Sequence, residues 1–314
     1  MRSEHALSKA RLSLAAAIAT MFCWGMNFAF VKHVLESLGV ETFMFIRFTA
    51  LPLLGFLLLL AIFRRRFVHT WPRRKDLPRF IACGFIGHAL HIAVVMHGMD
   101  LSTPFSSSLV LTSGPLFTLI ILAVLGVERL RLRQIAGTLV ALAGIALFLS
   151  DKFAAGFSRA GLGDLVLLAA AALFALYTVL VQPIAKRYGP LIVFCYTLLF
   201  SAPPVLLWTL PAFLATPASA YSTSVVLGLL WALGVSSFFG WLMWTWVNTV
   251  RGVARSAPLA YLTPPIAGMV AWLTLGESFT GLKIGGALIT MAGVAYAQFG
   301  SGPPSKEAAQ PDSA

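Results

Sequence analysis

Two histidines in one apolar stretch are the side chains best suited to chemistry in this sequence. His88 and His91 are three residues apart, so a helix would place them on one face. Ionisable groups deep in an apolar segment are costly and usually face a cavity. There, imidazoles could carry protons or donate hydrogen bonds to a carboxylate. The alternative is a neutral histidine bonded to a neighbouring carbonyl, and no metal is predicted because no third ligand is evident.

Arg47 and a set of aromatic or amide side chains are further candidates for binding a small molecule. Arg47 lies about two turns inside another apolar segment, where it could neutralise a carboxylate or extend its guanidinium outward to water. Aromatic rings inside such segments could stack against a ligand or serve only as packing. The candidates of this kind are Trp24, Asn27, Tyr177, Trp241, Trp244 and Tyr261.

Prolines interrupt two of the apolar segments at matching places. Pro115 and Pro264 each remove one helical hydrogen bond and bend the chain. The freed carbonyl needs a partner, which places the break beside protein or water. The hydroxyls of Ser113 and Thr263 are close enough in sequence to serve. Both breaks are predicted to be hinges or cavity walls, with a simple packing kink as the alternative.

A hydrolytic centre is a weaker interpretation of the same residues. Ser113 could be a nucleophile with His88 or His91 as its base. However, Ser113 lies in no G-x-S-x-G turn, and a second copy of the surrounding stretch has Leu262 in its place. The sequence also has no G-x-x-x-x-G-K-[ST] loop, so direct use of ATP is not predicted and no cofactor is expected.

Apolar segments of membrane-spanning length make up nearly the whole chain. Of the 314 residues, 59% are hydrophobic and 11% are charged, against about 25% charged in soluble domains. Runs of about 20 apolar residues cross a membrane as helices, because lipid offers open strands no hydrogen-bond partners. Ten are predicted, at Leu12–Val34, Thr42–Phe63, Phe80–Met99, Ser106–Val127, Leu132–Ser150, Leu162–Pro183, Pro190–Phe213, Val225–Val247, Val253–Leu275 and Leu282–Phe299. The expected fold class is therefore an all-α integral membrane protein.

The basic residues predict the orientation of these segments. The net charge is +12, but Lys and Arg cluster in short loops, above all between Arg64 and Arg79. This pattern is typical of membrane topology rather than of nucleic-acid binding, and it places both termini in the cytoplasm. The first segment is too long for a cleaved signal peptide. Residues 1–11 are therefore expected to be a cytoplasmic N-terminus, and residues 301–314 a disordered cytoplasmic tail.

The stretch 115–144 occurs again as 264–293, at an offset of 149. A proline, a glutamate and two glycines keep one spacing in both copies, which indicates duplication. Each copy belongs to a unit of five segments, and because five is odd the second unit must enter from the opposite side. The result is two inverted five-helix repeats, an arrangement characteristic of secondary transporters. The expected divisions are a first unit at 12–150, an external linker at 151–161 and a second unit at 162–300.

Small residues and two glutamates in the repeated stretch are predicted to be structural. Each copy places small residues on one helix face, which allows close packing in a membrane. These residues are Gly137, Ala141 and Gly144 in one copy and Gly286, Thr290 and Gly293 in the other. Glu128 and Glu277 precede the next helix, whose N-terminal dipole favours a carboxylate. Participation of either glutamate in a gate is the alternative.

The order and spacing of these features resemble the drug/metabolite transporter superfamily. CWGMNFAFVK at 23–32 and FMFIRF at 43–48 are similar to the start of an EamA-type unit, and the two copies of the repeated stretch are similar to its end. The resemblance implies a cavity lined by the first, third and fourth helices and by the sixth, eighth and ninth, with the fifth and tenth outside. The second unit departs from the pattern, with Phe174-Ala175 and Thr197 in place of the Trp-Gly pair and the arginine.

These observations predict a secondary transporter that exports small metabolites, such as amino acids or related compounds, by alternating access. The expected location is the bacterial cytoplasmic (inner) membrane. The expected partners are a small-molecule substrate and the lipid bilayer, and no nucleic acid. A channel or facilitator is the main alternative, and the intramembrane serine hydrolase is the lesser one. The sequence is compatible with a monomer and with a homodimer.

Overall fold

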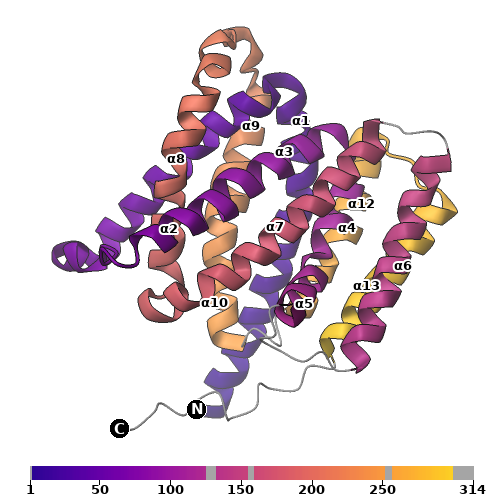
Figure 1. The fold of residues 1–314 in the computed structure, drawn as a ribbon, viewed down its shortest axis with the longest axis horizontal. Helices are drawn as coiled ribbons and strands as arrows, with labels where there is room; N and C mark the ends of the chain where they lie inside the picture. The colour runs from indigo at the N-terminus through magenta and orange to yellow at the C-terminus, as the bar shows by residue number, and fades with distance from the viewer. Residues whose placement is uncertain (1, 125–131, 155–158, 252–256, 300–314) are drawn as a thin grey trace.

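The computed structural model describes residues 2–124, 132–154, 159–251 and 257–299, and every regular element in these ranges is a helix (Figure 1). Up to the middle of the chain the elements are α1 (Arg2–Phe63), η1 (Arg64–Thr70), α2 (Leu77–Gly84), η2 (Phe85–Leu90), α3 (His91–Leu101), α4 (Pro104–Thr112), α5 (Gly114–Val124) and α6 (Leu132–Ala154). The remainder are α7 (Arg159–Tyr188), α8 (Pro190–Ala215), η3 (Ala218–Ala220), α9 (Thr223–Leu229), η4 (Leu230–Phe239), α10 (Gly240–Arg251), η5 (Ala257–Leu262), α12 (Thr263–Leu275) and α13 (Gly281–Phe299).

Seven helical segments of the described chain are long and apolar enough to cross a membrane. The first of them covers 60 residues, Arg11–Thr70, about three times the ~20 residues that one crossing needs. It is interrupted at Gly39, whose φ of 74° and ψ of 168° are not helical. Two shorter apolar helices, Leu259–Leu275 and Gly281–Ala297, complete the bundle. The chain is therefore an all-α, multi-pass membrane protein.

Backbone irregularities recur at matching positions in the two halves. Gly39 and Gly189, 150 residues apart, have φ values of 74° and 83°, which glycine adopts without the strain a Cβ would bring. The π-helical segments η2 and η4 also overlap at this offset. Finally, α4 ends at Thr112, three residues before Pro115, and η5 ends at Leu262, two residues before Pro264. The sequence duplication is thus accompanied by a duplication of backbone shape.

Helices α6 and α13 pack against each other through the small residues that the sequence predicts to allow close packing. A Cβ built on Gly144 would lie 2.4 Å from the backbone nitrogen of Thr290, and one on Gly286 would lie 2.5 Å from that of Phe148. Side chains larger than hydrogen are excluded from such contacts. Gly137 in turn lies against Ala297, so the two helices are antiparallel. Figure 1 shows this pair at one side of the molecule.

The remaining helices pack across the two halves and not only within them. Helix α1 contacts α8, α10 and α12, and α3 contacts α7. The main hydrophobic core lies where these helices meet, and it includes fully buried Phe43 and Met44 of α1 beside Leu198 of α8. Any movement of one half against the other must therefore rearrange this interface.

Candidate functional site

A cavity of about 620 Å³ lies between the two halves, a volume typical of small-molecule sites. Its walls come from α1, η2, α3, α4, α5, α7, α8, η4, α10, η5 and α12. Helices α6 and α13 contribute none of the lining residues. The lining therefore agrees with the expected set of helices and adds Arg47 and Leu51 from the second half of α1, and Phe194 and Leu198 from α8.

Most of the residues singled out in the sequence meet at this cavity. Those that line it are Trp24, Asn27, Arg47, His88, His91, Pro115, Tyr177, Trp241, Trp244, Tyr261 and Thr263. Ser113 and Pro264 are buried and do not line it. The Ser113 hydroxyl instead donates to the Val110 carbonyl, 2.5 Å away, which satisfies the backbone at the break between α4 and α5.

Both histidines are held by hydrogen bonds from the second half of the chain. His91 Nδ1 lies 2.9 Å from the carbonyl oxygen of Ala170, so this nitrogen carries the proton and donates. His88 Nε2 lies 3.1 Å from Oγ1 of Thr197. The bond from His91 to a backbone carbonyl is the arrangement that the sequence analysis named as the alternative to a role in proton transfer or ligand binding. In the part of the chain that the structure describes, no three His, Cys, Asp or Glu side chains are grouped to hold a metal ion.

The Arg47 side chain points into the cavity and does not extend outward to water. Its Nη1 donates to the hydroxyl of Ser237 in η4 at 2.9 Å. Its Nε is buried and has no hydrogen-bond partner. Nothing in the sequence distinguishes Ser237, because serines in apolar helices commonly bond to their own backbone, as Ser108 does with the Phe105 carbonyl at 2.7 Å.

Four aromatic rings form one wall of the cavity. Trp241 stacks on Phe194 with centroids 3.9 Å apart and planes 13° apart. Trp24 meets Trp244 edge to face at 5.6 Å, and its Nε1 donates to the carbonyl of Ser236 at 3.1 Å. That carbonyl lies in the π-helix η4, a geometry common at functional sites. The wall offers flat apolar surfaces on which a ligand could stack.

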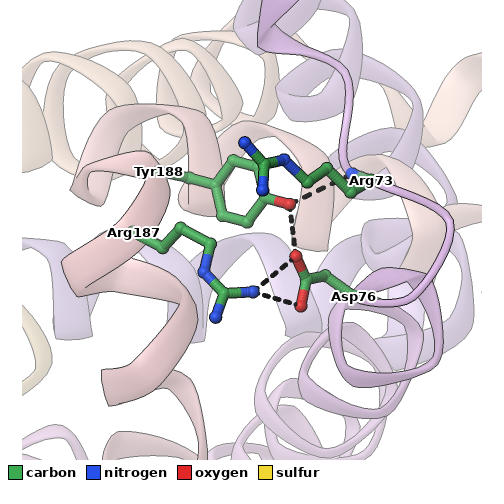
Figure 2. Close-up of polar contacts among 4 residues, drawn as sticks. All are labelled: Arg73, Asp76, Arg187 and Tyr188. Carbon is green, nitrogen blue, oxygen red and sulfur yellow. Dashed lines mark hydrogen bonds and ion pairs between the residues drawn. The ribbon is translucent and has the colours of Figure 1, made fainter. Parts of the chain in front are cut away.

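A polar cluster ties the loop before α2 to the end of α7, beyond the cavity (Figure 2). Arg187 Nη1 donates to both carboxylate oxygens of Asp76, at 2.6 and 2.8 Å. The Tyr188 hydroxyl donates to Asp76 Oδ2 at 2.5 Å and accepts from the backbone N–H of Arg73 at 3.0 Å. The hydrogen bond from Tyr188, followed by that from Arg187, lowers the pKa of the Asp76 carboxyl.

Different contacts join the halves near the start of α4. Oε2 of Glu277 accepts the backbone N–H of Phe105 at 3.4 Å. The carboxylate thus lies at the N-terminus of α4, while its predicted role at the N-terminus of α13, the helix that follows it in the sequence, stays a prediction. Nearby, the hydroxyl of Ser102 donates to Asp164 of the second half, whereas Lys32 donates to the carbonyl of Asp100 within the first half. The other predicted glutamate, Glu128, lies outside the described residues.

An all-helical membrane bundle with a cavity between two similar halves is the architecture of a membrane transporter. Residues 11–150 and 161–297 both match the EamA-like transporter family, and the chain belongs to this family. It is therefore a transporter and not an enzyme, so the serine hydrolase interpretation of Ser113 is wrong.

Proteins of similar sequence are named as exporters. A probable terminal-alkyne amino-acid exporter of Streptantibioticus cattleyicolor is 31% identical over 292 residues, which cover 92% of this chain and 93% of that protein. A probable amino-acid metabolite efflux pump of Salmonella typhimurium is 27% identical over 90% of this chain and 94% of its own. A chain of known crystal structure shares the fold, with a TM-score of 0.61 at 19% identity over 91% of this chain and 96% of its own.

Proposed function

We propose that this protein exports small metabolites, amino acids or related compounds, from the cytoplasm across the bacterial cytoplasmic membrane. The observation that carries the proposal is the cavity of about 620 Å³ whose walls come from both halves of the chain. The names of the similar exporters support the direction of transport and the class of substrate. Trp24, Trp241 and Trp244 would stack against the substrate, while Asn27, Tyr177 and Tyr261 would bind its polar groups.

The mechanism that we propose is alternating access by two inverted units of five spans each, 12–150 and 162–300. The count of ten follows if α1 crosses twice about Gly39 and the two shorter apolar helices also cross. The antiparallel contact of α6 with α13 supports the inversion. Gly137 contacts Ala297, and Phe148 contacts Gly286. At the repeat offset of 149, Gly137 is equivalent to Gly286 and Phe148 to Ala297, so each contact is the repeat of the other. A twofold axis perpendicular to the two helices produces such a pair of contacts.

The paired breaks would allow the units to move. Pro115 and Pro264 follow interruptions at Ser113 and Leu262, and a proline there lowers the number of hydrogen bonds that bending must disturb. Thr263 lines the cavity beside one break. The proposed cycle would open the cavity first to the cytoplasmic face and then to the external face. Residues 1–11 and 301–314 are expected on the cytoplasmic face, and the linker 151–161 on the external face.

Expression of the protein in a bacterial host with few exporters of its own tests this function. Cells that carry it should resist some toxic amino-acid or metabolite analogues better than cells with an empty vector. Preloaded cells should then release those compounds faster. In proteoliposomes, saturation and counterflow would indicate a carrier, whereas flux that rises linearly without counterflow would favour the channel or facilitator. Absence of both resistance and flux across a broad panel would contradict the proposal.

A further inference from the structure

The charge of the cavity lining is unbalanced. Arg47 contributes a guanidinium, which stays protonated in proteins, and neither Asp nor Glu is among the lining residues. No carboxylate of the described residues forms an ion pair with Arg47. Its guanidinium instead donates a hydrogen bond to the hydroxyl of Ser237. Arg47 is half-buried, and a charge partly withdrawn from water without a counter-charge is unfavourable. The protein thus maintains a positive site that an anionic group of a ligand would neutralise.

The donors of Arg47 are also incompletely used. Its Nη1 is fixed by Ser237 at 2.9 Å, while its buried Nε has no partner. An arginine presents its N–H groups in a planar fork, which matches the two oxygens of a carboxylate. The Ser237 bond holds one arm of this fork, so the side chain is already oriented before a ligand arrives.

A second unsatisfied group lies at a different depth, on the part of α1 before the turn at Gly39, whereas Arg47 lies on the part after it. Oδ1 of Asn27 is a buried acceptor without a partner, and it lines the cavity with Arg47. Counted along the helix from Gly39, Asn27 is about 18 Å away and Arg47 about 12 Å, so their depths differ by about 6 Å. The hydroxyl of Tyr261, also in the lining, is likewise unsatisfied. These groups can accept hydrogen bonds from an ammonium or amide but offer it no negative charge.

We infer that the cavity selects a carboxylate that carries a neighbouring N–H donor and an apolar side chain, with Arg47 binding the carboxylate and Asn27 accepting from the donor. This inference rests on the proposed function and names its substrate class. Neutral α-amino acids fit this description, because Arg47 would pair with their carboxylate and the neutral acceptor of Asn27 would bind their ammonium group. The wall formed by Trp241 and Phe194 would hold the apolar side chain. Compounds with a net positive charge are disfavoured, since no lining carboxylate balances them.

Binding to the purified full-length protein in lipid nanodiscs tests this inference with three probes. L-Phenylalanine has both polar groups, L-phenylalaninamide lacks the carboxylate, and 3-phenylpropanoate lacks the amine. The amide should bind at least tenfold more weakly than phenylalanine. Arg47→Gln should weaken phenylalanine binding about 10- to 100-fold, as loss of a charged hydrogen-bond pair does, and leave the weak amide binding unchanged. Arg47→Lys should restore part of the affinity because it retains charge without the fork.

The Asn27 site and the controls complete the experiment. Asn27→Leu should weaken phenylalanine and not 3-phenylpropanoate. Arg66→Gln, at an exposed arginine remote from the lining, should change neither. Equal affinity of wild type for phenylalanine and its amide, or no effect of Arg47→Gln on a correctly folded protein, would overturn the inference. If the protein exports only compounds that lack a carboxylate, the inference fails and the proposed function stands; if it exports nothing, the proposed function itself fails.

Discussion

At the scale of single residues, substitutions in the aromatic wall test the proposed site most directly. Trp241 lines the cavity and stacks on Phe194 at 3.9 Å. Trp241→Ala removes the surface against which a substrate would stack, a loss of about 0.5–1.5 kcal/mol for an aromatic contact, and should raise the KM for export several-fold. His91→Ala should also change transport, since it removes a lining side chain that is fixed to Ala170.

Initial rates of export at varied substrate concentrations measure these effects. Trp272→Ala is a matched control, because Trp272 is 60% exposed and does not line the cavity. Unchanged kinetics in both Trp241→Ala and His91→Ala would show that the central cavity is not the binding site.

Side chains of unusual type for a membrane segment were the ones that the sequence could identify. Arg47 and His91 carry a solvation cost in lipid, so their presence alone pointed to a cavity. Ser237 and Phe194 are chemically ordinary in such segments and gave no signal. Their importance comes from what they touch, namely Arg47 and Trp241, and contacts between distant segments are not encoded in local composition.

At the scale of helices, neighbouring glycines on α13 allow a matched test of packing. A Cβ on Gly286 would lie 2.5 Å from the backbone of Phe148 in α6, whereas a Cβ on Gly285 would meet nothing within 4 Å. Gly286→Ala should therefore destabilise the protein by about 1–3 kcal/mol, as overpacking does. Gly285→Ala should be neutral or slightly stabilising, because alanine favours helix over glycine. Thermal unfolding in detergent compares them, and equal melting temperatures would contradict the described contact.

The Asp76 cluster predicts a pH-dependent contribution to stability. Hydrogen bonds from Tyr188 and Arg187 lower the pKa of Asp76 in the folded protein. A carboxylate of this kind stabilises the fold above its unfolded pKa, and the contribution is lost as pH falls through the lowered folded pKa. Asp76→Asn should accordingly lower the Tm at neutral pH, and the difference from wild type should shrink in acid. Glu36→Gln, at an exposed acid, should show no such trend; a pH-independent difference for Asp76→Asn would contradict the assignment.

The boundaries of most helices followed from apolar run length, but their internal irregularities did not. The segments Leu12–Val34 and Thr42–Phe63 predict a turn between them, and the structure has one at Gly39, a positive-φ residue. The π-helical segment η4, by contrast, had no sequence signal, because a π-helix differs from an α-helix in its hydrogen bonding and not in its composition. The Ser236 carbonyl of that segment is the acceptor for Trp24, so this part of the site was inaccessible to sequence reasoning.

At the scale of the whole molecule, the proposed inversion of the two units makes equivalent residues face opposite sides of the membrane. Glu36 and Lys186 are equivalent at an offset of 150, and both are exposed. Lys186 lies one residue before Arg187 of the Asp76 cluster, next to the strongly basic loop between Arg64 and Arg79, which the distribution of charges predicts to be cytoplasmic. Glu36 lies three residues before the turn at Gly39, at the other end of its span.

A single cysteine at each position distinguishes inverted from parallel units. The background variant replaces Cys23, Cys83 and Cys195, all of them free thiols, with alanine and must retain export. In intact cells, a membrane-impermeant maleimide should label Glu36→Cys, whereas Lys186→Cys should react only after the membrane is opened, since inversion puts the two thiols on opposite faces. Arg74→Cys, in the exposed basic loop, should behave like Lys186→Cys. Labelling of Glu36→Cys and Lys186→Cys from the same side would exclude the inverted arrangement and with it the rocking of two units about the cavity, whatever the substrate.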